Sequence, residues 1–305
     1  MKHAFLIIAH NEFDLLGHLV ELLDHPDNAF YIHVDLKAAD FDAERLRKQV
    51  TRSKLSVYRE MSVLWGDVSQ VRCELSLLKH AARDGYDYYH FLSGSDLPLQ
   101  PVAEIHRFFK ENAGKEWIHF DAPVAGESVK SRVLYRRWLT GKLKASHFRI
   151  INKMTFILDH LLTKAQKALR MERKIPYPVI QKGCNWCSIS DAFARYALDR
   201  EDEILTYLDK SFCGDEMLFQ TLCVNSDFRE RLYNQDFDNN YDACKRLIIW
   251  DERNRKSPKT FSNEDWEVLL NSSCLFARKF SLVKEPAFTM AWIERIRKLN
   301  AGGTV

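Results

Sequence analysis

Near the amino terminus stand two short apolar runs, Phe5-Leu6-Ile7-Ile8-Ala9 and Phe30-Tyr31-Ile32-His33-Val34-Asp35. The segment between them, from Phe13 to Leu23, is amphipathic. A continuous apolar run of this length is typical of a strand buried on both faces, whereas the intervening segment has the periodicity of a surface helix. The order strand, helix, strand therefore predicts two parallel strands of one sheet that are joined by a helical crossover.

The same alternation continues along the first 125 residues. It predicts further strands at 55–58, 88–92 and 117–120, and helices around 44–46, at 68–82 and at 101–111. We therefore expect an α/β fold with a mostly parallel central sheet flanked by helices. Ligands of such sheets bind at the carboxyl ends of the strands. The polar residues at the predicted strand ends are site candidates: His10, Asp35, Ser93 and Asp96.

From residue 126 to 177 the sequence becomes helical, basic and aromatic. Between Lys130 and Lys174 there are thirteen Lys or Arg, against two acids, Asp159 and Glu172. Apolar residues recur there at roughly helical spacing: Phe148, Ile151, Phe156, Leu158, Leu161 and Leu162. This pattern fits a helix packed on its own core, and it also fits a surface helix that contacts anionic lipid.

The last third of the chain returns to mixed structure. Strand character reappears at 179–190 and 246–250, Ser262 opens a helix with a capping-box pattern, and an amphipathic helix runs from Thr289 to Leu299. We see no internal repeat and no low-complexity linker. The whole chain, 1–305, is therefore expected to form a single domain.

The composition is that of an ordinary soluble globular protein, with 46% apolar residues and a net charge of +3. That charge is too small to argue for nucleic acid. No run approaches the roughly 20 apolar residues of a membrane span, and the first apolar run is too short for a signal peptide. Seven scattered cysteines suit a reducing cytoplasm. We interpret Cys184 and Cys187, a lone C-x-x-C pair, as two buried thiols.

Several familiar cofactor motifs do not occur: G-x-G-x-x-G, the P-loop, H-E-x-x-H and paired zinc ligands. The D-x-D triplet occurs twice, at 40–42 and 236–238, and neither lies plainly at a central strand end. We interpret both as chance acids and expect no metal site. Any diphosphate would then need basic side chains. Arg253, Arg255, Lys256 and Lys259 precede the capped helix, and Arg278-Lys279 follows it. These clusters could grip a diphosphate or be a solvated basic surface.

An acid pair, Asp215-Glu216, follows Phe212-Cys213-Gly214 and precedes the helical run 217–222. Unpaired backbone N–H groups at a helix N-terminus stabilise an ionised carboxylate. Glu216 could therefore be an aimed general base, and the plainer alternative is that the pair caps the helix.

Six motifs together resemble one known family. They are Tyr31-Ile32-His33-Val34-Asp35 with Lys37, Trp65-Gly66, Phe91-Leu92-Ser93-Gly94-Ser95-Asp96-Leu97-Pro98-Leu99, Lys182-Gly183-Cys184-Asn185-Trp186, Asp215-Glu216 and Leu275-Phe276-Ala277-Arg278-Lys279-Phe280. In this order they resemble the core-2/I-branching β-1,6-N-acetylglucosaminyltransferases, a family that includes the peptide O-xylosyltransferases. The resemblance implies a GT-A-type nucleotide-sugar-binding fold and an inverting, metal-independent transfer from a UDP-sugar.

The resemblance also implies roles for single residues. Glu216 is the implied catalytic base, Asp35 the uracil-binding acid and Lys279 a diphosphate ligand. Lys256 best fits the second diphosphate ligand by spacing, with Arg255 and Lys259 as rivals. The implied nucleotide-sugar site is His10, Asp35, Lys256, Arg278 and Lys279, and the implied acceptor site is Asn185, Trp186, Trp250 and Asp215. The domain then divides into a nucleotide-binding half (1–125), a helical basic insertion (126–178) and an acceptor or catalytic half (179–305).

We therefore expect an enzyme that moves GlcNAc or xylose from a UDP-sugar to a glycan hydroxyl, without a cofactor or metal. The disulfides and membrane anchor of the family's animal members have no evident counterpart here. This difference suggests a bacterial-type cytoplasmic enzyme of surface polysaccharide synthesis, whose basic segment 130–174 meets anionic membrane or a lipid-linked acceptor. One alternative is a non-catalytic nucleotide- or sugar-binding protein on the same fold. A nucleic-acid-binding protein is a further alternative, but the basic block lacks a recognised binding motif.

Overall fold

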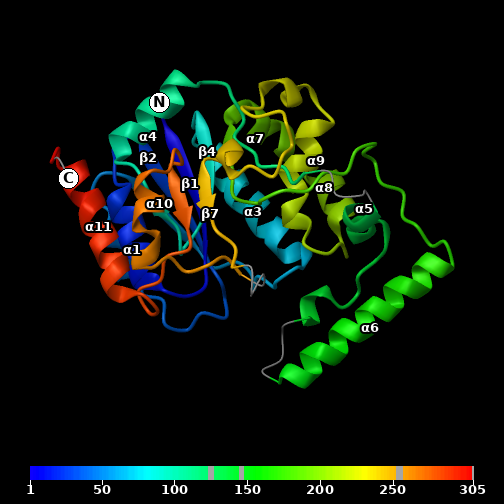
Figure 1. The fold of residues 1–305 in the computed structure, drawn as a ribbon. Coiled ribbons are helices and arrows are strands. Elements are labelled where there is room, and N and C mark those ends of the chain that lie inside the picture. The colour runs from blue at the N-terminus through cyan, green and yellow to red at the C-terminus, as the bar shows by residue number, and fades with distance from the viewer. Residues whose placement is uncertain (123–126, 144–147, 252–256, 304–305) are drawn as a thin grey trace.

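The structure, a computed structural model, describes residues 1–122, 127–143, 148–251 and 257–303. Its main sheet has five strands in the order β3-β2-β1-β4-β6 (Figure 1). The strands are β1 (His3–Ala9), β2 (Asn28–Val34), β3 (Lys54–Tyr58), β4 (Tyr88–Ser93) and β6 (Ser188–Ser190). The pairs β1–β2, β1–β4 and β2–β3 are parallel, and only β6 runs antiparallel to its neighbour. The predicted α/β class with a mostly parallel sheet is confirmed.

Helices cover both faces of this sheet, because successive strand residues point to opposite sides. Phe5 and Ile7 of β1 face one core, whereas Ala4 and Leu6 face the other. The first core lies under α1 (Phe13–Leu22), α4 (Val102–Glu111), α10 (Trp266–Leu270) and α11 (Pro286–Asn300). The second core lies under α3 (Val68–Ala82), α7 (Asp191–Leu198), α8 (Glu201–Leu208) and α9 (Leu218–Val224). The strands are therefore buried on both faces, as their apolar runs predict.

A second, three-stranded sheet joins the end of the chain to the main body. It has the order β5-β8-β7, with β5 (Leu97–Pro98), β7 (Arg246–Ile248) and β8 (Phe276–Arg278). The predicted strand at 246–250 therefore ends two residues early. The capping box predicted at Ser262 is confirmed, with Asp265 as its second member. Since β5 follows β4 closely, this small sheet brings the basic residues of β8 to the end of the main sheet.

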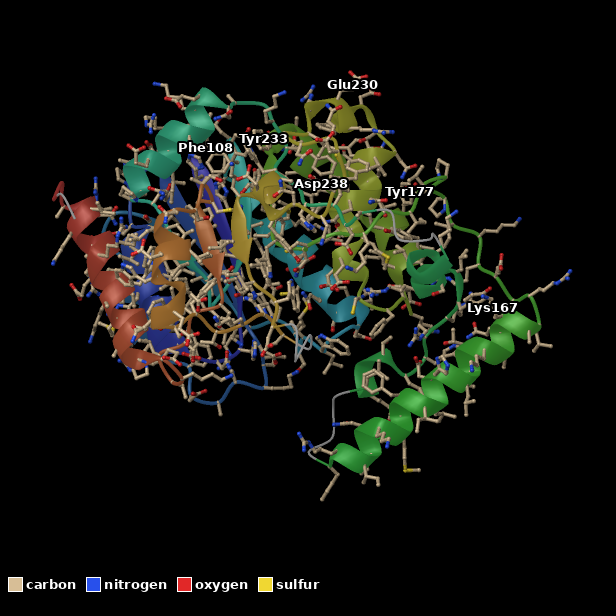
Figure 2. The ribbon with its side chains drawn as sticks, in the orientation of Figure 1. Phe108, Lys167, Tyr177, Glu230, Tyr233 and Asp238 are labelled. Carbon is tan, nitrogen blue, oxygen red and sulfur yellow. The ribbon has the colours of Figure 1, made fainter. Side chains whose placement is uncertain are left out.

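The remaining elements are short turns and the helices of the basic segment. They are α2 (Ala43–Arg47), α5 (Glu127–Leu134), α6 (Arg149–Ala168) and five 3₁₀ turns, η1 (Thr140–Lys142), η2 (Gly214–Glu216), η3 (Asp227–Arg231), η4 (Tyr241–Cys244) and η5 (Asn263–Asp265). Figure 1 shows α6 standing out from the rest of the molecule, and Figure 2 shows its side chains, Lys167 among them, projecting around it. Only Asp159 and Gln166 of α6 are buried. The interpretation of this helix as packed on its own core is therefore wrong.

Two predicted strands are also wrong or too long. Residues 117–120 are extended but form only an isolated bridge, between Trp117 and Ser188. The segment 179–190 contributes just β6 at its end. Both segments are apolar because they pack in the interior: Trp117 in the first core, and Ile118, Phe120, Cys187 and Ile189 in the second.

A row of imidazoles lies at the amino edge of the main sheet. His3 Nδ1 and His90 Nε2 are 2.8 Å apart, and the other nitrogen of His90 contacts the Ser188 hydroxyl at 2.7 Å. Burial, together with the neighbouring His106, lowers the pKa of His3 to about 2. Burial and His25 lower the pKa of His106 to about 4. These rings are therefore neutral, and they pack as polar aromatic core between β1 and α4, beside the chain's N-terminus in Figure 1.

The described part of the chain has no helix that is both long and apolar enough to cross a bilayer. All seven cysteines are free thiols. Burial raises the pKa values of the Cys184 and Cys187 thiols well above the ordinary value of a thiol. Both thiols are therefore protonated; Cys187 is buried as expected, whereas Cys184 is partly exposed.

Candidate active site

The carboxyl edge of the main sheet brings the predicted strand-end residues together. The Asp35 backbone N–H donates to the Ala9 carbonyl at 3.0 Å, and the Gly94 N–H donates to the Ile8 carbonyl at 3.1 Å. The ends of β1, β2 and β4 are thus joined by backbone hydrogen bonds. His10, Asp35, Ser93 and Asp96 consequently lie along one edge, which is where ligands of parallel sheets bind.

Arg278 crosses from the small sheet to this edge. Its Nη1 donates to Asp96 Oδ1 at 3.0 Å and to the Ser93 hydroxyl. The guanidinium also lies over the Trp186 ring, 5.1 Å from the ring centroid. These contacts fix a planar cation between the end of β4 and Trp186, and such a group suits oxyanion recognition.

Lys279 and His10 extend this positive edge. Half-burial, together with Arg278 and Lys284, lowers the pKa of Lys279. Partial burial lowers the pKa of His10, and the positive charges of Lys279 and Arg278 lower it further. Each of these positive charges disfavours the charged form of its neighbours, and a bound anion would offset that repulsion. The predicted ligand Lys256 and its rival Arg255 lie outside the described residues.

The other rival, Lys259, is already occupied. Its Nζ donates to Asp265 Oδ1 at 2.7 Å, and Asp265 is the acid of the capping box. Lys259 therefore holds a helix start. This contact makes it the weaker of the two described basic neighbours, Lys259 and Lys279, as a diphosphate ligand.

Asp35 is buried at the end of β2 and organises the loop beyond it. Its carboxylate accepts the Lys37 N–H at 2.8 Å and the Val63 N–H at 3.2 Å, and it pairs with the Lys37 ammonium at 3.2 Å. These bonds tie residues 61–64 to the sheet edge. Asp35 thus lies at the strand end where it was predicted, and its role in binding uracil stays a prediction.

Glu216 lies on the second-core side of this edge, at the end of the turn η2. The expected helix N-terminus differs in detail, because Met217 separates Glu216 from α9 and is itself the N-cap without a side-chain hydrogen bond. The pair Asp215-Glu216 therefore does not cap α9 through its side chains. What holds Glu216 is charge: Arg132 Nη1 lies 2.7 Å from its Oε2, and Lys182 Nζ lies 3.4 Å from the same atom.

These cations were not predicted as site residues. Lys182 belongs to a quoted motif without an assigned role, and Arg132 is one of many cations in the basic segment. Lys182 also pairs with Asp121 at 2.6 Å, and the neighbouring carboxylates outweigh its burial and raise its pKa. The signal that could find Lys182 is its place beside Asn185-Trp186. Nothing in the sequence separates Arg132 from its basic neighbours.

Gly183 sets the position of the segment 182–186 against residues 119–121. Its N–H donates to the Glu216 carbonyl at 2.9 Å, and the flanking Lys182 carbonyl accepts the Asp121 N–H at 2.9 Å. A Cβ on Gly183 would lie 1.8 Å from the His119 carbonyl oxygen. Only glycine allows this approach. It places Lys182 at Glu216 and Trp186 at Arg278.

Asp215 points into the protein and not toward an acceptor surface. It is buried, and its Oδ1 has no hydrogen-bond partner among the described residues. Burial and the Glu216 charge raise its pKa to about 7. Glu74 of α3 is also buried, and burial with Asp215 raises its pKa well above the ordinary value. Asn185 Nδ2 contacts Glu74 Oε1 at 3.4 Å, so Asn185 lies over this pair of acids.

Trp250 is the exposed aromatic residue of the predicted acceptor side. Its side chain is 43% exposed, and its Nε1 donates to the Tyr241 hydroxyl at 2.9 Å. The Tyr241 ring stacks on His119 with centroids 4.1 Å apart, and His119 Nδ1 accepts the Cys184 N–H at 3.0 Å. A continuous chain of contacts thus links Trp250 to the segment that carries Asn185 and Trp186.

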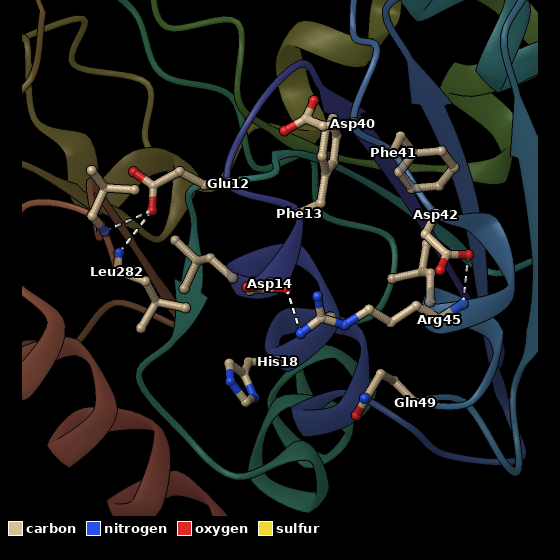
Figure 3. Close-up of a pocket in the computed structure, with 14 residues that line it drawn as sticks. Glu12, Phe13, Asp14, His18, Asp40, Phe41, Asp42, Arg45, Gln49 and Leu282 are labelled. Carbon is tan, nitrogen blue, oxygen red and sulfur yellow. Dashed lines mark hydrogen bonds and ion pairs between the residues drawn. The ribbon is translucent and has the colours of Figure 1, made fainter.

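A cavity of about 350 Å³ lies at the amino end of α1, beyond His10 (Figure 3). Glu12, Asp14, Asp40 and Asp42 line it, with Arg45 paired to Asp14 at 2.8 Å. The acids have structural tasks. Glu12 binds the backbone N–H of Leu282 at 2.7 Å, and Asp42, from the first D-x-D triplet, caps α2. A cavity dominated by carboxylates repels a diphosphate, so the positive sheet edge is the better candidate site.

In the second D-x-D triplet, Asp238 Oδ1 accepts the Asn240 N–H at 3.1 Å. It therefore stabilises a turn, and Figure 2 shows Asp238 away from α1 and β2. Both triplets have local roles in the backbone. Whether the enzyme needs a metal stays an expectation from the sequence.

Comparison with known proteins agrees with this geometry. The family model of the Core-2/I-Branching enzymes matches residues 3–271. The human N-acetyllactosaminide beta-1,6-N-acetylglucosaminyl-transferase is 23% identical over 99% of this chain and 74% of its own length. Rat xylosyltransferase 2 is 23% identical over 92% of this chain, which spans 32% of that protein. The matched range contains the strand-end residues His10, Asp35, Ser93 and Asp96 as well as Glu216 and Trp250, and it ends before Arg278 and Lys279.

Among solved structures, mouse xyloside xylosyltransferase 1 aligns with 72% of this chain and 80% of its own, at 10% identity. The TM-score of 0.33 is too low for that alignment to support an argument. The family match carries the conclusion, because it covers nearly the whole of the described fold. The chain belongs to the Core-2/I-Branching enzyme family, and it is a glycosyltransferase.

Proposed function

We propose that this enzyme transfers GlcNAc or xylose from a UDP-sugar to a glycan hydroxyl with inversion, forming a β-linkage, and that Glu216 is the base. The observation that carries the proposal is the pairing of one part-exposed carboxylate, Glu216, with a separate group of cations at the sheet edge, Arg278 and Lys279. Transfer from a nucleoside diphosphate sugar needs both: a base for the acceptor and positive charge for the leaving group.

In this mechanism the acceptor hydroxyl hydrogen-bonds Glu216 and attacks the anomeric carbon from the face opposite UDP. The O–H proton passes to the Glu216 carboxylate, the new C–O bond forms, and the bond to the diphosphate oxygen breaks. Arg132 and Lys182 both contact Oε2 of Glu216, so we expect Oε1 to accept the proton. Arg132 and Lys182 keep the carboxylate oriented.

The leaving diphosphate gains negative charge as its bond to the sugar breaks. Arg278 lowers the pKa of its neighbour Lys279, and together these two cations would stabilise that charge without needing to move. Trp250 and Trp186 are aromatic rings of the kind that sugars stack on; Trp186 lies beside Arg278, and Trp250 is held by the Tyr241 hydroxyl. The GT-A-type arrangement expected from the sequence supports the same division between donor and acceptor.

Replacement of the base tests the proposal. Glu216→Gln keeps the size of the side chain but removes its basicity, so turnover should fall by about 10²–10⁴-fold, the usual contribution of a general base. UDP binding, measured by calorimetry, should stay within twofold. The matched control is Glu267→Gln, an exposed glutamate on α10, which should leave both quantities unchanged. Unaltered turnover in Glu216→Gln would contradict the assignment of the base.

The proposal also includes catalysis without a divalent metal on the diphosphate. The rate in excess chelator should equal the rate after addition of excess Mg²⁺ or Mn²⁺, because fixed side-chain cations supply the charge. A rate that depends on either ion would overturn this part and would point back to the D-x-D acids.

We further propose that α6 docks on an anionic membrane and so presents lipid-linked acceptor to the site. Its large apolar residues are exposed, with Ile150 at 69% and Met154 at 65%. Residues 150, 154, 157 and 161 follow the helical period and form one stripe. Asp159, which pairs with Arg137, and Gln166 tether the helix from the opposite side. Arg149, Lys153 and Lys164 flank the stripe, as in interfacial helices.

Vesicle flotation tests this docking. The protein should float with vesicles that contain anionic lipid and not with neutral ones, and Met154→Ser combined with Leu161→Ser should abolish flotation. Val283→Ser removes another exposed apolar side chain, 80% exposed and distant in sequence, and is the matched control. If the α6 variant floats as well as the parent does, membrane docking is refuted. Dimerisation that depends on protein concentration and is lost in the α6 variant would also refute it, because a second copy of the chain would then cover the stripe. Surface polysaccharide synthesis and a cytoplasmic location stay predictions.

A further inference from the structure

Three side chains that can bind metals lie together at the amino edge of the main sheet, at the opposite end of the strands from the candidate active site. They are His25, Asp27 and His106, and one ligand atom of each lies within 4.8 Å of the others. The rings of His25 and His106 have centroids 4.3 Å apart. We propose that these three residues bind one divalent transition-metal ion, with Zn²⁺ as the best fit, at a site remote from the candidate active site.

The backbone fixes two of the three ligands. The Asn28 N–H donates to the His25 carbonyl at 2.9 Å, which closes a tight turn with Pro26 at its second position. The His25 N–H in turn donates to the Ser53 hydroxyl at 2.9 Å. His25 and Asp27 therefore stand two residues apart in a turn that is anchored on both sides, just before β2 begins.

The third ligand, His106, is oriented by a neighbour of the kind that metal-binding histidines have. Its Nε2 lies 2.8 Å from Asn28 Oδ1, while Asn28 Nδ2 donates to the Leu23 carbonyl at 2.7 Å. Because the amide nitrogen is used by Leu23, the oxygen faces His106, and His106 Nε2 must carry the hydrogen. Nδ1 then keeps its lone pair for a metal, held by an outer partner.

A further imidazole adjoins the cluster. The His3 ring meets the His106 ring edge-on, with centroids 4.4 Å apart, and His3 Nε2 is buried without a partner in the described part of the chain. Two imidazoles and one carboxylate are a donor set typical of Zn²⁺, with water completing the coordination. Mg²⁺ and Ca²⁺ prefer ligand sets made only of oxygen. The chemistry therefore favours a borderline metal.

Such an ion would link the turn between α1 and β2 to α4, elements that are about 80 residues apart in sequence. The turn contributes Asp27 and α4 contributes His106. The site is separated from the strand ends at His10 by the seven residues of β1, roughly 20 Å. The ion would therefore stabilise the fold without taking part in transfer, and the inference does not rest on the proposed function.

The test uses the full chain without an affinity tag, freed of metal by chelation. Calorimetric titration with Zn²⁺ should show one site, and the melting temperature should rise with Zn²⁺ concentration. His106→Gln and Asp27→Asn should each weaken Zn²⁺ binding by about 100-fold or more, since loss of an outer partner alone typically costs 10–100-fold. The control is His160→Gln, an exposed histidine on α6, which should bind as the parent does.

Substituted Co²⁺ identifies the ligands by absorption. Nitrogen and oxygen ligation should give visible bands without the near-ultraviolet charge-transfer band of a thiolate. A thiolate band, no saturable binding by the parent, or parent-like binding by both folded variants would each overturn the proposal. The melting curves of the metal-free proteins, recorded first, separate loss of a ligand from loss of the fold, and Asp27→Asn at an exposed turn position is the milder of the two changes.

Discussion

Two long amphipathic helices of this enzyme place similar apolar patterns in opposite surroundings. In α3 eight of the fifteen residues are buried, and the helix packs in the second core. In α6, which has twenty residues, only Asp159 and Gln166 are buried, and the apolar stripe faces outward. The comparison teaches that helical periodicity marks a face that must meet something apolar, but not whether the partner lies in the same chain.

The two helices also bury their acids differently. Burial raises the pKa of Glu74 of α3, and the neighbouring Asp215 raises it further. Asp159 of α6 pairs with Arg137, which lies on the segment before η1. The acid of α3 thus belongs to the interior of the site, whereas the acid of α6 is the tether that holds a projecting helix.

The largest expected contrast is in stability. Leu78→Ala in α3 should lower the free energy of unfolding by about 2–5 kcal/mol, because it removes a buried side chain and leaves a cavity. Leu161→Ala in α6 should change it by less than about 0.5 kcal/mol, because that leucine is exposed. Urea denaturation measures both. A comparable loss in Leu161→Ala would break the comparison and show that α6 packs on the protein.

Next in size is the effect of pH through the buried acids. Folding raises the pKa of Glu74 above 4.5 and that of Asp215 from 3.8 to about 7, so the folded state holds protons that the unfolded state releases. The free energy of unfolding should therefore fall as pH rises from about 4 to 7, by on the order of 2–4 kcal/mol. In Glu74→Gln this dependence should shrink.

Denaturation curves at pH 4.5 and pH 8 measure the difference directly. The control is Asp227→Asn, an exposed acid at the start of η3, which should keep the parent's dependence on pH. If Glu74→Gln loses stability equally at both values, the acid is ionised in the fold, and the contrast with Asp159 disappears.

The smallest expected effect concerns the tether. Asp159→Asn removes the charge that pairs with Arg137 and should cost about 1.5–3 kcal/mol, the usual range for a hydrogen bond between charged groups. Protease cleavage within 148–170 should become faster, because α6 is then held mainly by Gln166. His160→Gln, an exposed residue on the same helix, is the control, and equal cleavage of the two variants would show that Asp159 is not the tether.

The sheet and its helices could be predicted because they are encoded locally. Helix 68–82 has the predicted bounds, the strands predicted at 5–9, 55–58 and 88–92 lie within those observed, and the run 30–35 extends one residue beyond β2. Residues 117–120 could not be placed, since an apolar run does not reveal whether a partner strand exists. The sequence likewise did not determine whether the apolar face of α6 is buried or exposed, because that depends on tertiary packing.

The candidate site could be located only in part. Residues at strand ends are found by position, and Glu216 by its place in an ordered set of motifs. Arg132 could not be found, because its distance from Glu216 depends on how a segment 84 residues away folds back. The same holds for His25 and His106, which share no sequence spacing. Residue pairs that only the fold brings together leave no local pattern in the sequence.

Gly183 has a consequence for experiments that substitute every position in turn. Its close approach to the His119 carbonyl leaves no room for any side chain, so all nineteen replacements should behave alike. In a deep mutational scan this position would read as wholly intolerant although it supplies no functional group. Lys182 beside it should instead show graded tolerance according to charge. A scan could thus distinguish the residue that sets the register of the segment from the residues that use it.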